Sequence, residues 1–246
     1  MSRSRPATLV LLVVTALLSY QGFAVESEWL DMEGRIEYAF YTEDARALRD
    51  IAAQLARNEA TQEPLSAYYA GLANYRLALV LASRDKEHAK DAIERCIDRL
   101  SGSLKAQPDF APALALQSAC LRTASILSPW NPLAGTRSAG QMARASKLAP
   151  RDPRVLLLQA LEKGESGPID DEALAKLQEA AAAFEAERHA VEHAPRWGAA
   201  EAYAHLGRGY LERGDVLAAR DALERALLIA PDFALARRLL MEITSG

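Results

Sequence analysis

Residues 200–233 read AEAYAHLGRGYLERGDVLAARDALERALLIAPDF, and this stretch decides the fold. Four of its residues recur at the helical spacing i, i+3, i+4 and i+7 and share one face: Tyr203, Leu206, Gly207 and Tyr210. Gly214 and Asp215 then break the helix, and Asp215 is placed to cap a second one. The second helix carries an inner stripe of Ala219, Leu223 and Ala226 before Pro231 ends it. The stretch therefore predicts a helical hairpin.

The order aromatic, Leu-Gly, Tyr, Ala, large apolar residue, Ala and Pro, over a unit of about 34 residues, resembles the tetratricopeptide repeat (TPR). The resemblance implies close crossing of the two helices at Gly207 and Ala219, with Tyr203 and Tyr210 filling the space above and below. It also implies that Ala226 lies where the following helix packs. The family fold is an α-solenoid of stacked helix pairs, which presents a groove to another protein.

The ending of this unit recurs upstream at residues 104–111 and 146–153, with a weaker copy at 191–195. The gaps between the matching prolines are 42, 45 and 36 residues, so the register of the middle units departs from the standard period. We predict an all-α fold of about five helix pairs and a C-terminal capping helix. The expected helices cover about 27–41 and 43–58, 65–83 and 86–106, 111–127 and 136–148, 153–163 and 170–193, the hairpin 200–230, and the cap 233–244.

Composition agrees with a helical protein and limits its partners. The chain has 246 residues, of which half are hydrophobic and a quarter are charged, and its net charge is -4. Ala and Leu dominate, and both lose little side-chain entropy in a helix. The mild acidity gives no electrostatic footprint for nucleic acid.

The N-terminus has the order of a secretory signal peptide: a basic start with Arg3 and Arg5, an uncharged apolar run from 9 to 18, and Gly22-Phe23-Ala24. We predict cleavage after Ala24, which leaves a single domain over 25–246 in the periplasm and changes the net charge from -4 to -6. The apolar run is short for a bilayer span, which takes roughly 20 residues. The alternative is an uncleaved segment that anchors the protein at the inner membrane, and only then would a membrane be a partner.

Two cysteines, Cys96 and Cys120, lie among apolar residues on predicted helices. An oxidising compartment would allow a disulfide. The other interpretation is a pair of buried free thiols that pack as small hydrophobic side chains. Spacing alone does not decide between them.

By alignment with the 200–233 unit, five residues point from the first helix of each pair toward the concave surface: Tyr69, Arg76, Arg122, Arg154 and Arg208. We predict that this set contacts an extended peptide or a helix of another protein. The alternative is that each is an ordinary solvated side chain. The Lys and Asn set with which some TPR domains hold a C-terminal carboxylate is missing, because the equivalent places in the 200–233 unit hold Ala204 and Arg208.

Other candidate sites are weaker. Trp130 and Trp197 lie in short loops, where an indole ring serves either as an interface anchor or as a plug at the edge of the core, and we favour the plug. Glu185, His189 and His193 share a helix face, but zinc needs three or four ligands, and a fourth would have to come from a distant residue such as His205. The sequence has no HExxH, phosphate-loop, Gly-x-Ser-x-Gly or dinucleotide motif.

We therefore predict a non-catalytic, cofactor-free and metal-free interaction module, a periplasmic scaffold or chaperone-like binder of another exported protein. The alternatives are a membrane-anchored assembly spacer and, more weakly, a metal-dependent hydrolase. Fold alone does not decide among them.

Overall fold

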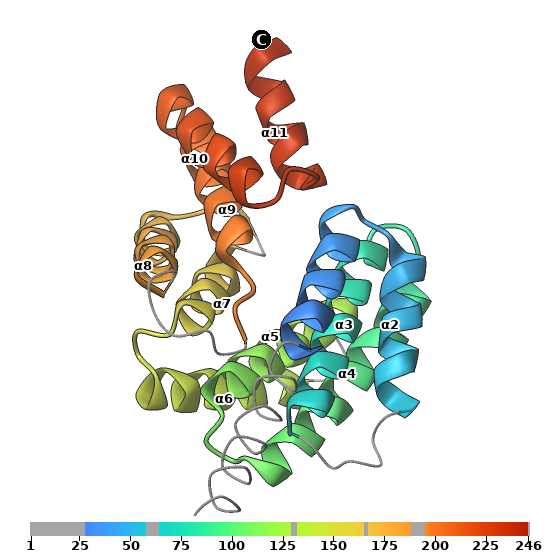
Figure 1. Ribbon diagram of the computed structural model, residues 1–246. Helices are drawn as coiled ribbons and strands as arrows, with labels where there is room; N and C mark the ends of the chain where they lie inside the picture. The colour runs from blue at the N-terminus through green and yellow to red at the C-terminus, as the bar shows by residue number, and fades with distance from the viewer. Residues whose placement is uncertain (1–27, 58–63, 129–131, 165–166, 188–194, 246) are drawn as a thin grey trace, which may run out of the picture.

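The computed structural model describes residues 28–57, 64–128, 132–164, 167–187 and 195–245. The described residues form helices and no strand, so the all-α prediction is confirmed (Figure 1). A first helical segment covers 28–41. The helices that follow are α2 (Ala45–Arg57), α3 (Pro64–Leu81), α4 (Lys86–Ala106), α5 (Ala111–Leu127), α6 (Pro132–Leu148), α7 (Pro153–Gly164), α8 (Asp171–Glu187), α9 (Ala199–Glu212), α10 (Val216–Ile229) and α11 (Ala234–Ser245). The predicted signal segment 1–24 lies outside the described residues.

Consecutive helices pack as hairpins. The pairs are α3 with α4, α5 with α6, α7 with α8, and α9 with α10, and each pair contacts the next. The turns have local causes, because Asp85 and Asp215 accept hydrogen bonds from the first-turn amides of His88 and Ala218. The start of α6 at Pro132 is four residues earlier than the expected 136. Proline at the first helical position explains this start, because its missing N–H has no partner to lose there.

Within the α9–α10 hairpin, Gly207 lies directly against the second helix. A Cβ at this position would lie 2.5 Å from Cγ of Leu223 and 3.3 Å from the carbonyl oxygen of Ala219. The crossing therefore leaves no room for a side chain at this position. The other packing residues of the unit are buried or half-buried, namely Tyr203, Leu206, Tyr210, Ala219, Leu223 and Ala226, whereas Pro231 is exposed in the turn before α11.

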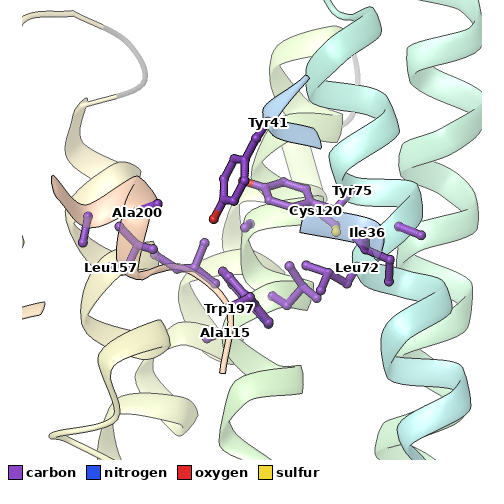
Figure 2. Packing of buried hydrophobic residues seen from close by; sticks show 14 of the residues in the cluster. Ile36, Tyr41, Leu72, Tyr75, Ala115, Cys120, Leu157, Trp197 and Ala200 are labelled. Carbon is purple, nitrogen blue, oxygen red and sulfur yellow. The ribbon is translucent and has the colours of Figure 1, made fainter. Parts of the chain in front are cut away.

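One hydrophobic core runs through the whole array. Figure 2 shows side chains from the first helical segment, α3, α5 and α7 lying near Trp197 and Ala200 at the start of α9. Cys96 of α4 and Cys120 of α5 are both buried and form a disulfide, with their Cα atoms 6.4 Å apart. Of the two interpretations of these cysteines, the structure has the disulfide.

The array curves until its two ends touch. The rings of Tyr41 and Phe233 have centroids 4.4 Å apart, and Nη1 of Arg238 donates to Oε1 of Glu43 at 2.6 Å across 195 residues of sequence. The first helical segment thus contacts the start of α11. In the part of the chain that the structure describes, no helix is long and apolar enough to cross a membrane.

Candidate functional site: a buried charge network and two surface clefts

The closure of the array centres on Arg76 of α3, whose side chain is 1% exposed. Its guanidinium donates to both carboxylate oxygens of Glu201 at the start of α9, and Nη2 also donates to Oε1 of Glu37 at 3.2 Å. The Phe40 and Trp197 rings lie 4.2 and 4.8 Å from the guanidinium carbon, which adds cation–π attraction. One arginine therefore joins the first helical segment, α3 and α9.

The acidic side of this network is only partly neutralised. Glu37, Glu201 and Arg76 together carry one positive and two negative formal charges in a buried site, and the hydroxyl of Tyr41 donates to Glu37. Burial raises the pKa of Glu201 to about 7, although the Arg76 guanidinium opposes this shift. Burial therefore disfavours ionisation of both carboxylates together in this network.

Glu33 forms a second buried contact of the first helical segment. Its carboxylate accepts the Arg196 backbone N–H at 3.0 Å and the Tyr69 hydroxyl at 2.8 Å. Burial raises the pKa of Glu33 to about 7 because these hydrogen bonds only partly replace water. Tyr69 also stacks on Trp29, with ring centroids 5.6 Å apart. Buried carboxylates thus connect the elements of the interior, although burial destabilises their charged form.

The structure spreads the five predicted groove residues over different environments. Tyr69 and Arg76 are buried as described above, and Arg154 is buried between Asp152 and Glu187. Arg122 lies 3.8 Å from Glu162, and Arg208 lies 3.5 Å from Glu212. All five therefore have acidic or aromatic partners within the chain, and residues of the segments 28–41 and 195–198 supply those of Tyr69 and Arg76. Contact of this set with another protein stays a prediction.

The two loop tryptophans and the possible metal ligands are the remaining candidates from the sequence. Trp197 is buried and its Nε1 donates to the Tyr68 hydroxyl at 2.7 Å, as expected of a core plug. Trp130, His189 and His193 lie outside the described residues. Glu185 accepts a hydrogen bond from the Tyr203 hydroxyl at 2.8 Å. Across the described ranges, no three His, Cys, Asp or Glu side chains are grouped in a way that would hold a metal ion.

A groove, which we call the outer groove, opens between α8 and α10 and has α9 as its floor. It consists of two adjoining hollows of about 390 and 400 Å³ that share Glu185, Tyr203 and Arg225. Tyr203, Leu206 and Tyr210 line its floor, and alanines of α8 and α10 line its walls: Ala181, Ala182, Ala218 and Ala222. Leu228, 84% exposed, lies at one end. The outer groove thus combines an apolar floor with small walls.

A second hollow, the end cleft, lies where the two ends of the array meet. Its volume is about 450 Å³, and residues of the first helical segment, α3, α9 and α11 line it. Arg84 and Arg238 both pair with Glu43 at its rim. His205 lies in its wall, and burial lowers the pKa of this imidazole to about 3, so the ring is neutral at pH 7.

Sequence reasoning missed the acidic residues of the interior. The signal was present, because Glu33 and Glu37 lie four apart beside the apolar Ile36 and Phe40, and Glu201 interrupts a run of small and apolar residues. An acid on an apolar helix face needs a buried partner. Its partner is not readable from spacing, since Arg76 and Glu201 are 125 residues apart.

Comparison with known proteins leaves the family resemblance as it stood. No protein-family model matches the sequence, and no curated protein matches it either. The likeness to the TPR unit rests on the spacing of residues within 200–233.

Proposed function

We propose that this protein is a non-catalytic TPR-like module of the periplasm that binds an amphipathic helix of another exported protein in the outer groove. The observation that carries the proposal is the outer groove itself, with its exposed leucine. The sequential hairpins and the side-chain-free crossing at Gly207 support the solenoid part of the proposal.

The shape and chemistry of the outer groove fit a helix. The alanine walls project little into the outer groove, and Tyr203, Leu206 and Tyr210 offer apolar surface to the buried face of a guest helix. Aromatic floors are common centres of binding energy because they bury much area with few rotatable bonds. Glu185, Asp221 and Arg225 line the same groove, and they offer both signs of charge to the polar flanks of a guest helix.

Leu228 and Leu217 form a matched pair for the test. Both are leucines of α10, 84% and 79% exposed, but only Leu228 lines the outer groove. A photo-crosslinking amino acid placed at 228 is expected to capture one defined periplasmic protein in cells, whereas the same group at 217 captures none. Leu228→Arg is then expected to weaken binding of that purified partner by tenfold or more, and Leu217→Arg by less than twofold.

Equal capture at the two positions, or equal loss of affinity in the two variants, would overturn the outer groove as the site. Export is tested separately by sequencing the N-terminus of the mature protein, which is expected to begin at Val25. An intact N-terminus would favour the membrane-anchored spacer. Stoichiometric zinc in purified protein would instead revive the hydrolase alternative.

A further inference from the structure

The end cleft is a second site, separate from the outer groove. We propose that it binds a small organic carboxylate with an apolar body. The body would lie against the aromatic floor, and the carboxylate would meet the two arginines at the rim.

The interior of the end cleft suits an apolar body. Phe40, Tyr41 and Phe233 contribute three aromatic rings, and Leu79 and Val80 of α3 add aliphatic surface. A volume of about 450 Å³ falls within the range of roughly 300–1,000 Å³ that small-molecule sites occupy. The lining thus combines apolar side chains with polar ones, and such polar groups can orient a bound molecule.

The rim selects an anion. Arg84 and Arg238 each donate one hydrogen bond to Glu43, at 2.5 and 2.6 Å, although a guanidinium has five N–H donors. Two positive charges against one negative charge leave a surplus of one positive charge at the mouth. Because the planar donor fork of arginine matches a carboxylate in two hydrogen bonds, a carboxylate is the group that this rim recognises best.

The turn after the first helical segment places Glu43 at the rim. Glu43 has φ of +55°, and among the described residues it is the one non-glycine residue with a positive φ. This left-handed residue ends the first helical segment, because the amide N–H of Asp44 donates to the carbonyl oxygen of Ala39. Here it places the Glu43 carboxylate between Arg84 of the α3–α4 turn and Arg238 of α11, and thereby brings two guanidinium groups together.

His205 adds a neutral polar group to the wall. Its Nδ1 is buried and has no hydrogen-bond partner. Arg76 and Arg208 are the charged groups that act on it, and both favour the neutral ring. The imidazole therefore adds a neutral ring to the wall of the end cleft.

The probe for this site is 3-phenylpropionate, with 3-phenylpropionamide as its uncharged counterpart. Isothermal titration calorimetry on the full processed chain is expected to show saturable binding of the acid with a Kd on the order of 1 mM, and binding of the amide at least tenfold weaker. Nuclear Overhauser effects between the phenyl protons of the probe and the methyl groups of Val80 are expected to place the probe in the end cleft.

Arg238 and Arg237 form the matched control, because their side chains are 51% and 54% exposed and each pairs with one acid. Arg238→Gln is expected to weaken binding of the acid by tenfold or more, and Arg237→Gln by less than twofold. Glu43→Gln is expected to tighten binding severalfold, because it removes the competing negative charge. If Glu43 served only to hold the rim together, Glu43→Gln would weaken binding of the acid instead.

The proposal fails if the acid shows no saturable binding up to about 10 mM, if the amide binds equally well, or if the two arginine variants behave alike. It also fails if Glu43→Gln weakens binding while its circular dichroism and melting temperature match those of the parent protein. None of these results bears on the outer groove, which shares no lining residue with the end cleft.

Discussion

Replacement of Arg76 by methionine tests the buried network most directly. Methionine keeps the apolar stem but removes the charge, so the carboxylates of Glu37 and Glu201 lose their cationic partner in a site where the Arg76 side chain is 1% exposed. Removal of one partner of a buried ion pair costs about 3–5 kcal/mol. Because small domains are stable by only about 5–15 kcal/mol, the loss is easily measured. Urea unfolding followed by circular dichroism is the assay.

The pH dependence of this loss identifies its cause. In the parent protein the pKa of Glu201 is raised from 4.5 to about 7, and loss of Arg76 raises it further. A carboxyl whose pKa is higher in the folded state stabilises the fold below its unfolded pKa, and that stability is lost as pH rises through the folded pKa. Between pH 4.5 and about 7 both proteins lose this stability alike, so the difference between Arg76→Met and the parent should grow mainly as the pH rises above about 7.

The controls separate charge from packing. The double variant Arg76→Met, Glu201→Gln is expected to lose less free energy of unfolding than the two single losses added together, because the second change removes one of the unpaired charges. Arg220→Met removes an exposed arginine paired with Glu224 and should leave stability nearly unchanged. A loss below about 1 kcal/mol at pH 9, or a loss that does not vary with pH, would refute the reasoning.

Three further outcomes follow from the packing and the titrating groups. Cys96→Ser should cost about 3.5 kcal/mol in urea unfolding, because the bond to Cys120 closes a loop with a separation of 24 residues; an unchanged midpoint would contradict a formed bond. Gly207→Ala should lower the free energy of unfolding by about 1–3 kcal/mol, because the added Cβ meets the leucine of the facing helix. At the exposed Gly140 an added Cβ meets nothing within 4 Å, so Gly140→Ala should raise the free energy of unfolding by roughly 0.5–1 kcal/mol. Equal effects of the two variants would contradict the tight crossing. Ionisation of Glu33 should cost the parent protein up to roughly 3 kcal/mol of stability between pH 4.5 and pH 7, and Glu33→Gln should abolish this loss. An unchanged pH profile of stability would argue against the raised pKa.

Helix positions were accessible to sequence reasoning because their causes are local. Asp215 caps α10, and the small and apolar stripe that begins at Ala219 faces α9, as the spacing indicated. Boundaries moved where a local signal was undervalued, as at Pro132. The resemblance to the repeat family also predicted which face of each helix points to the concave surface. It did not indicate that Tyr69, Arg76 and Arg154 on that face are buried.

The inner side of the array was not accessible in the same way. The repeat pattern places Arg76 on an open concave face, but curvature depends on small rotations between successive pairs, and no single pair encodes them. One sequence feature did point inward. Helix α3 carries one charged residue in eighteen, and a helix that is apolar all round is a buried helix. Its single arginine therefore needed an internal acid, and Glu37 and Glu201 are those acids.

The closure of the array connects the interior to the outer groove through α9. Glu201 and Tyr203 lie two residues apart on this helix; Glu201 is fixed inward by Arg76, and Tyr203 forms the floor of the outer groove. Because a helix moves as a rigid body over so short a distance, the ion pair between Arg76 and Glu201 also fixes the position of Tyr203 in the outer groove. Arg76→Met should therefore weaken partner binding at pH 7.5 more than at pH 5, although Arg76 lies nowhere in the outer groove. Equal affinity of the parent and variant for the partner at both pH values would show that the two faces of α9 are independent.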